Sequence, residues 1–141
     1  MHDVLIRKID SREFVVGVIG LGYVGLPLAI HFAENGFYAH GFDIDPHKIQ
    51  SLNQGDSYIR HIDSHSVRSN IRSGRFTAYS DFDRLVECDA IIITVPTPLS
   101  MNQEPDLSFI ESTARSISNH LREEQIVILE STTYPGTTED V

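Results

Sequence analysis

The glycine-rich run GLGYVG at residues 20–25 limits the possible folds of this chain more than any other segment. An apolar, β-branched stretch at 14–19 precedes the run and predicts a buried strand of a parallel sheet. Apolar residues recur at helical spacing over 26–33, and a second apolar run at 39–42 then ends in Asp43. A strand, a Gly-x-Gly-x-x-Gly turn, a helix, a strand and a terminal acid in this order predict a dinucleotide-binding unit.

The three glycines of the run have separate predicted roles. Gly20 allows the chain to turn sharply off the strand, and Gly22 has no Cβ, so a pyrophosphate can approach its backbone. Gly25 allows the following helix to pack closely on the sheet. The free amides around Tyr23 and Val24 are expected to point toward the anion, which the helix dipole also favours. The alternative is that these glycines serve tight packing only.

Asp43 indicates which dinucleotide binds. Its carboxylate is expected to accept hydrogen bonds from the adenosine ribose hydroxyls, and its charge would repel a 2′-phosphate, so NAD is favoured over NADP. A basic side chain is expected near the phosphates, and Lys48 is the candidate. The alternative for Asp43 is a solvated residue of a turn.

Strands and helices alternate along the rest of the chain. Strands are predicted near 14–19, 37–43, 75–79, 89–95 and 125–129, and helices near 23–35, 46–55, 64–73, 81–87 and 107–122, the last one capped by Asp106. This alternation predicts a single α/β domain over 14–141, a Rossmann-type doubly wound parallel sheet with helices on both faces. Residues 1–13 are expected to form a helical lead-in.

The charge of the chain narrows its possible partners. Its 141 residues carry 11 basic and 20 acidic side chains, and the formal net charge of −9 argues against binding to nucleic acid or to anionic membranes. No run is long enough to span a membrane, and the first nine residues are too mixed in charge for a secretion signal. The cytoplasm is therefore the expected location.

Cysteine and histidine do not indicate a metal or nucleophilic site. Cys88 is the only cysteine, has no evident activating base nearby, and is expected to be a small buried residue at the end of a helix. His61 and His65 would share a face only if their segment were helical, whereas 56–63 is predicted to be a loop. No metal ligand is therefore predicted.

Two further strand ends bring hydroxyl groups to the edge of the sheet that carries the glycine turn. In a doubly wound sheet, ligands bind at the carboxyl ends of the strands. Thr97 lies in the segment 95–98 and Thr132 in the segment 130–133, and both segments follow predicted strands directly. These hydroxyls are candidates for ligand contacts; the alternative is that each satisfies the backbone of its own turn.

Together these segments resemble the nucleotide-sugar 6-dehydrogenases, the UDP-glucose/GDP-mannose dehydrogenase family. The matching stretches are VIGLGYVGLPLA at 18–29, GFDID at 41–45, TVPTP at 94–98, EPD at 104–106, EST at 130–132 and PG at 135–136. The resemblance covers nearly all of the chain after residue 13. The TVPTP and EST versions look closest to the members that act on UDP-N-acetylhexosamines, such as UDP-N-acetylglucosamine.

The resemblance implies an oxidation used in polysaccharide biosynthesis. The C6 hydroxymethyl group of a UDP-sugar is oxidised twice to a carboxylate, and two NAD molecules each accept a hydride. A cysteine traps the intermediate aldehyde as a thiohemiacetal, a second oxidation gives a thioester, and water then releases the uronic acid.

The roles of family residues carry over onto the matching positions of this chain. The resemblance assigns residues 23–24 to the pyrophosphate-binding turn and Asp43 to the ribose hydroxyls. Lys48 takes the place of a basic residue beside the adenosine, which is often arginine; lysine keeps the charge but loses the planar fork. Thr97 matches a residue near the nicotinamide half, and Thr132 matches a supporting hydroxyl near the reacting centre.

The catalytic cysteine of the family, with its lysine and asparagine, belongs to a later part of the protein and has no counterpart among these residues. Because covalent oxidation needs its nucleophile in place, the resemblance implies the N-terminal cofactor domain of a longer, homo-oligomeric enzyme whose other domains hold most of the UDP-sugar. Alone, the chain is expected to bind NAD without turnover. The alternatives are a stand-alone NAD-sensing module without chemistry and the cofactor domain of a 6-phosphogluconate-type or hydroxyacyl-type dehydrogenase.

Overall fold

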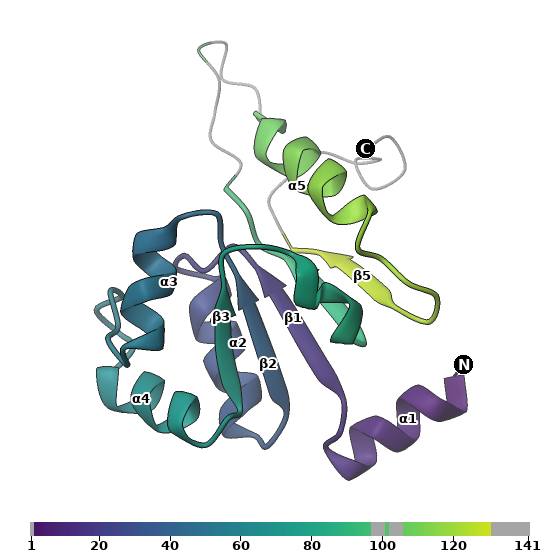
Figure 1. Ribbon diagram of the computed structural model, residues 1–141, viewed down its shortest axis with the longest axis horizontal. Helices are drawn as coiled ribbons and strands as arrows, with labels where there is room; N and C mark the ends of the chain where they lie inside the picture. Colours follow the sequence, from purple (N-terminus) through teal and green to yellow (C-terminus); the bar gives the residue numbers. More distant parts are fainter. Residues whose placement is uncertain (1, 97–100, 102–105, 131–141) are drawn as a thin grey trace.

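A five-stranded parallel sheet forms the centre of the computed structural model, which describes residues 2–96, 101 and 106–130. The strands are β1 (Val15–Ile19), β2 (Tyr38–Phe42), β3 (Phe76–Tyr79), β4 (Ala90–Ile93) and β5 (Ile126–Leu129). Their order is β3-β2-β1-β4-β5, and each neighbouring pair is parallel (Figure 1). The chain thus starts in the middle of the sheet, builds one side and then the other, which confirms the predicted doubly wound fold.

Helices cover both faces of the sheet. They are α1 (His2–Ser11), α2 (Gly25–Glu34), α3 (Pro46–Asn53), α4 (Ser64–Arg72), the 3₁₀ helix η1 (Asp83–Glu87) and α5 (Ser108–Ser118). The α2, α3 and α4 helices lie together on one side in Figure 1, and α5 lies apart from them. This arrangement follows from the right-handed connections between parallel strands.

Two apolar clusters fill the space between the sheet and these helices. The larger cluster joins alternate residues of the strands, such as Val16 and Val18, to buried residues of α1, α2, α3 and α4. The smaller cluster joins Ile19, Ile91 and other residues of the opposite face to η1 and α5. Residues of one strand alternate between the two clusters because successive side chains of a strand point to opposite faces.

Several helices differ from the prediction in length or type. The α2 helix begins at Gly25 rather than at residue 23, so the turn stays open for two more residues. The predicted helix 81–87 is a 3₁₀ helix, and α5 ends at Ser118 instead of continuing to 122. In the segment after α5, the backbone N–H of Arg122 donates to the side-chain Oε1 of Gln125 (2.9 Å).

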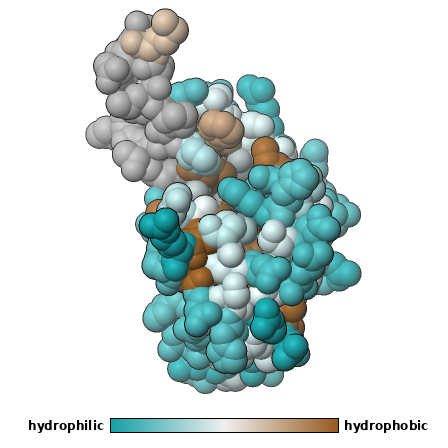
Figure 2. All heavy atoms as spheres, turned by 90° about the vertical axis from the view of Figure 1, so that its left-hand side faces the viewer, coloured by the Kyte–Doolittle hydropathy of each residue, from teal (hydrophilic) through white to brown (hydrophobic). Residues whose placement is uncertain are grey.

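The outer surface over α3 and α4 is polar. Figure 2 shows this side of the molecule, on which hydrophilic residues predominate and apolar residues form small separate patches. Among the described residues, no helix is both long and apolar enough to cross a membrane.

Asp89, directly before β4, connects the amino end of the sheet to two distant segments. Its side chain is buried, and it accepts hydrogen bonds from the backbone N–H of Val15 (2.9 Å) and from Nζ of Lys8 in α1 (2.8 Å). A guanidinium nitrogen of Arg122, in the segment before β5, lies 3.2 Å from the same carboxylate. Burial would raise the pKa of Asp89, but the bonds from Lys8 and Val15 outweigh it, and the pKa is lowered.

The contacts of Asp89 predict a measurable loss of stability for Asp89→Asn. The asparagine side chain keeps the shape of the aspartate but loses the negative charge that pairs with Lys8 and Arg122 and accepts from the Val15 N–H. The free energy of unfolding should therefore fall by about 1–3 kcal/mol. Because the folded pKa is depressed, this contribution is complete above the unfolded pKa of about 3.9 and disappears as the pH falls through the folded value.

Urea denaturation at several pH values tests this prediction. The two proteins should differ most near neutral pH, and their stabilities should converge below about pH 4. The exposed Glu34→Gln, which removes one carboxylate from the end of α2, serves as the control and should leave stability unchanged within about 0.5 kcal/mol. A difference in the free energy of unfolding between the wild type and Asp89→Asn that does not change with pH would contradict the assigned role of the carboxylate.

Candidate functional site

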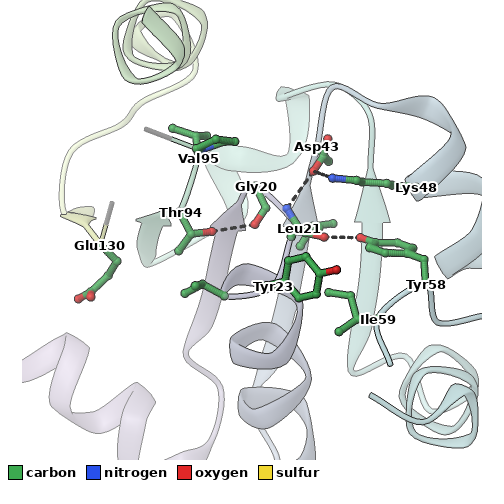
Figure 3. A pocket seen from close by; sticks show the side chains of 13 residues that line it. Gly20, Leu21, Tyr23, Asp43, Lys48, Tyr58, Ile59, Thr94, Val95 and Glu130 are labelled. Carbon is green, nitrogen blue, oxygen red and sulfur yellow. Dashed lines mark hydrogen bonds and ion pairs between the residues drawn. The ribbon is translucent and has the colours of Figure 1, made fainter. Parts of the chain in front are cut away.

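The carboxyl ends of β1, β2, β4 and β5 meet around one cavity of about 560 Å³ (Figure 3). Its lining residues are Gly20, Leu21, Gly22, Tyr23, Val24, Asp43, Lys48, Tyr58, Ile59, Thr94, Val95, Pro96 and Glu130. The cavity opens where the strand order reverses, between β1 and β4. This is the position at which doubly wound sheets bind their ligands.

Steric constraints require glycine at both ends of the turn. Gly20 has a φ of +92°, and a Cβ there would lie 2.9 Å from the carbonyl oxygen of Thr94. A Cβ on Gly25 would overlap the carbonyl oxygen of Gly20 and approach Oγ1 of Thr94. Gly25 therefore allows the start of α2 to close against the turn and the end of β4, a more local role than the predicted packing of the helix on the sheet.

The middle of the turn exposes backbone amides. Within the described part of the chain, the N–H groups of Gly22, Tyr23 and Val24 donate to no acceptor. These three residues directly precede the first residue of α2, where the positive end of the helix dipole lies. A Cβ on Gly22 would meet no protein atom within 4 Å, so the space beside its backbone is open. The turn thus offers an anion several donors without displacing a protein contact.

Two successive peptide groups orient this turn. The Gly20–Leu21 peptide is held at both ends, because Oγ1 of Thr94 donates to the Gly20 carbonyl (2.7 Å) and the Leu21 N–H donates to Oδ2 of Asp43 (2.9 Å). The Leu21–Gly22 peptide is held only through its carbonyl, which accepts from the hydroxyl of Tyr58. These contacts come from β4, β2 and the loop before α4, three segments far apart in the sequence (Figure 3).

Asp43 has structural contacts in addition to its predicted role with a ribose. Its Oδ1 accepts from the backbone N–H of Asp45 (2.9 Å), and Nζ of Lys48 lies 3.8 Å from its Oδ2. Its side chain is only 11% exposed, so it is not a solvated turn residue. A carboxylate has about four acceptor positions, so it retains capacity for further hydrogen bonds.

A second hollow of about 220 Å³ lies on the other side of Asp43, between the ends of β2 and β4 and the α5 helix. Its apolar lining includes Ile44, Phe82, Val95, Pro96 and Phe109. Asp43 and Lys48 line both spaces, so an elongated ligand can extend from the glycine turn across Asp43 into this apolar hollow.

The structure brings most of the predicted binding residues together. Those that line the main cavity are Gly20, Gly22, Tyr23, Val24, Asp43 and Lys48. Gly25 shapes the turn from behind. Thr97 and Thr132 lie outside the described residues, so their assignments stay predictions.

The histidines and the cysteine have other contacts. The ring of His61 stacks on Tyr23, with centroids 6.5 Å apart, while Asp63 caps α4 by accepting from the backbone N–H of His65. Over residues 2–96 and 106–130, no three histidine, cysteine or acidic side chains are grouped to hold a metal ion. Cys88 directly follows η1 and is buried, as predicted, and this burial raises the pKa of its thiol to about 12.

Tyr58, Thr94 and Glu130 line the cavity but were not among the predicted site residues. Thr94 and Glu130 directly follow β4 and β5, so their position at the ligand-binding edge was a usable signal. Tyr58 lies in a predicted loop, and no motif or periodicity places its hydroxyl on a turn 37 residues earlier in the sequence.

Comparison with known proteins identifies relatives across nearly the whole chain. The model of the UDP-glucose/GDP-mannose dehydrogenase family, NAD binding domain, matches residues 14–141. UDP-N-acetyl-D-mannosamine dehydrogenase of Escherichia coli K12 is 43% identical over 124 residues, which are 88% of this chain and 29% of that protein. UDP-N-acetyl-D-glucosamine 6-dehydrogenase of Pseudomonas aeruginosa is 36% identical over 129 residues, which are 92% of this chain and 30% of that protein.

A solved structure shows the same architecture. GDP-mannose dehydrogenase from Pseudomonas aeruginosa, crystallised as a ternary complex, aligns with a TM-score of 0.84 and 32% identity. The alignment covers 89% of this chain and 30% of that one. The chain therefore spans about three tenths of the length of the relatives it matches.

The steric environments of two glycines predict that alanine changes stability by very different amounts at the two positions. Gly25→Ala should lower the free energy of unfolding by about 3 kcal/mol or more, because the new methyl group overlaps the Gly20 carbonyl oxygen in the folded state. Gly22→Ala should change stability by less than about 1 kcal/mol, because its methyl group meets no protein atom.

Thermal and urea denaturation of the two variants, together with dinucleotide titration of Gly22→Ala, separate folding from binding. Gly22→Ala should remain folded yet bind the dinucleotide more weakly, since its methyl group occupies the open space beside the amides. A destabilisation by Gly22→Ala as large as that by Gly25→Ala would contradict the steric assignment.

Proposed function

The chain belongs to the UDP-glucose/GDP-mannose dehydrogenase family, whose NAD-binding domain it matches over residues 14–141, and we propose that it serves an enzyme that oxidises the C6 hydroxymethyl group of a UDP-sugar to a carboxylate. The family match and the identity of up to 43% with UDP-sugar dehydrogenases favour this assignment over the 6-phosphogluconate-type and hydroxyacyl-type dehydrogenases. When bound, NAD supplies the acceptor for the hydride that leaves the sugar carbon.

The observation that carries the proposal is the row of amides that have no acceptor within the described residues, next to a partly buried carboxylate in one cavity. The amides of Gly22, Tyr23 and Val24 are assigned to the pyrophosphate, because they have no described acceptor and precede a helix. Asp43 is assigned to the adenosine ribose hydroxyls. The apolar hollow beside Ile44 fits the adenine ring.

The preference for NAD depends on the charges around Asp43. A 2′-phosphate on the adenosine ribose would be placed against this carboxylate, in a partly buried position where charges are poorly screened. Lys48 offsets part of that repulsion, because its ammonium group lies 3.8 Å from the carboxylate. The assignment therefore predicts a preference for NAD that is moderate rather than absolute.

The rest of the reaction is proposed by comparison with the family. The names of the two reported protein relatives point to a UDP-N-acetylhexosamine as substrate, which agrees with the TVPTP and EST segments. Thr97 is proposed to contact the nicotinamide half, and Thr132 to support the reacting centre. Polysaccharide biosynthesis, a cytoplasmic location and a homo-oligomeric enzyme belong to the same proposal.

Cys88 does not qualify as the nucleophile of this chemistry. Burial holds the pKa of its thiol near 12, and a Cβ on Gly17 would lie only 2.8 Å from its sulfur, so the thiol is packed against the centre of β1. A thiol must be deprotonated and accessible in order to attack an aldehyde. The nucleophile is therefore proposed to lie in a part of the enzyme outside these 141 residues.

The role of Asp43 predicts the effect of Asp43→Asn on cofactor choice. Unmodified protein should bind NAD more tightly than NADP, and the substitution should narrow this ratio by about tenfold, or about 1.4 kcal/mol, because the repelling charge is removed. Calorimetric titration with both cofactors measures the ratio. Asp45→Asn removes a neighbouring charge but keeps a capping side chain, so it should leave the ratio nearly unchanged. Equal affinity of the unmodified protein for NAD and NADP would refute the assignment.

Because the nucleophile and most of the UDP-sugar site are proposed to lie outside these residues, the 141-residue chain is expected to form no NADH from NAD and a UDP-sugar. UDP-N-acetylglucosamine is the substrate to use, with NADH fluorescence as the measurement and a full-length relative of the family as the positive control. Binding of NAD without turnover is the expected result. Turnover above background by the purified chain would show that the residues needed for at least the first oxidation lie within this chain.

A further inference from the structure

Tyr58 links the glycine turn to the loop between α3 and α4. Its hydroxyl donates to the carbonyl oxygen of Leu21, the second residue of the turn. The loop around it is ordered by its own hydrogen bonds: the N–H of Ser57 donates to Oγ of Ser64 (2.9 Å), and the N–H of Ile59 donates to Oγ of Ser57 (3.1 Å). Ile59 is also buried in the larger apolar cluster. The loop that carries Tyr58 is therefore held in place beside the turn by its own hydrogen bonds and by the burial of Ile59.

The hydrogen bond from Tyr58 affects more than the atom that accepts it. The Leu21 carbonyl and the Gly22 N–H belong to one planar peptide group, in which they point in opposite directions. Holding the carbonyl therefore also sets the direction of the Gly22 N–H, which faces away from Tyr58 and has no acceptor among the described residues. A hydrogen bond to the carbonyl also polarises the peptide group and strengthens its N–H as a donor.

The neighbouring peptide group shows why this contact matters. The Gly20–Leu21 peptide is held at its carbonyl by Thr94 and at its N–H by Asp43, so both of its polar groups are occupied. In the Leu21–Gly22 peptide the carbonyl is occupied, whereas the N–H has no acceptor in the part of the chain that the structure describes. The protein thus orients this second peptide through the end that a ligand does not need.

The hydroxyl of Tyr58 keeps its proton and can therefore always donate a hydrogen bond. Burial raises its pKa, and the nearby carboxylates of Asp43 and Asp45 raise it further. The group therefore stays protonated throughout the physiological pH range. The ring is a separate feature: it forms part of the cavity wall and lies 5.8 Å from the ammonium group of Lys48.

We propose that Tyr58 is a positioning residue for the cofactor pyrophosphate, acting through the Leu21 carbonyl to aim and polarise the Gly22 N–H. This inference rests on the proposed function, in which the glycine turn binds the pyrophosphate of NAD. The hydroxyl of Tyr58 does not itself contact the phosphate. Its effect should therefore depend on the phosphate groups of a ligand and not on the adenosine.

Tyr58→Phe tests the proposal, because it keeps the ring in the cavity wall and removes only the donor. In calorimetric titrations of the 141-residue chain, the substitution should weaken NAD and ADP by about fivefold, the effect of one hydrogen bond. Adenosine, which has no phosphate, should be weakened by less than about twofold. Tyr38→Phe is the matched control, since Tyr38 lies at the amino end of β2, outside the cavity. Removal of its hydroxyl should leave the affinities for NAD, ADP and adenosine unchanged.

The possible outcomes separate this inference from the proposed function. If the unmodified chain binds no NAD, the proposed function fails. If the unmodified chain binds NAD and Tyr58→Phe binds it equally well, or loses adenosine affinity to the same extent, the positioning role is overturned and Tyr58 is only a wall of the cavity.

A second measurement applies even if Tyr58→Phe does not fold. In amide NMR spectra of the unmodified chain, the Gly22 resonance should move downfield when ADP is added and should stay in place when adenosine is added. If other resonances show that ADP binds but the Gly22 amide does not respond, the proposal is overturned regardless of how the variant behaves.

Discussion

The site depends on one steric constraint, the contact between the first and last glycines of the turn. Because the start of α2 comes so close to the Gly20 carbonyl, no Cβ fits on Gly25, and the chain must leave β1 with a positive φ at Gly20. This contact places the residues before α2 over the end of β4, where Oγ1 of Thr94 donates to the carbonyl of Gly20. The amides of the turn, for which the described residues offer no acceptor, thus lie next to a tightly packed contact between Gly20 and Gly25.

Asp43 connects this constraint to cofactor choice. The same carboxylate that is expected to bind the ribose accepts the Leu21 N–H and the Asp45 N–H, so it orders the turn and the start of α3 before any ligand arrives. A side chain with two such partners has few accessible rotamers, which reduces the entropy lost on binding. Structural and binding roles therefore coincide in one residue, and a change in its charge is expected to affect both.

The sequence predicted the fold well because its dominant signals are local. Three of the strands, β1, β4 and β5, are short apolar runs rich in β-branched residues, and glycines such as Gly36 and Gly74 end helices with the positive φ that other residues adopt rarely. The prediction was less accurate at the start of α2 and the end of α5, where steric and side-chain contacts are made: Gly25 packs against the Gly20 carbonyl and Thr94, and the Arg122 N–H donates to the side chain of Gln125. Neither effect appears in helix propensity.

The candidate site was predictable to the extent that it lies on strand ends. Gly20, Gly22 and Asp43 follow from the order of elements, because parallel strands bring their carboxyl ends to one edge. Tyr58 does not follow from that order, because the position of its loop beside the turn depends on how α3 and α4 pack on the sheet. A hydrogen bond across 37 residues is a property of the packed structure rather than of any motif.

The polar groups at the two ends of the parallel strands are satisfied in opposite ways. At the amino edge, the buried Asp89 is surrounded by Lys8, Arg122 and the Val15 N–H, so its charge is paired and the edge is closed. At the carboxyl edge, the packing leaves backbone donors without protein partners in the described structure, although such groups are costly when deprived of water. The paired charges at the amino ends of the strands contribute stability, and the turn at the carboxyl ends keeps its N–H donors oriented for a ligand. A phosphate that binds there replaces water at amides whose direction is already set, so little of its interaction energy is lost to reorganising the protein.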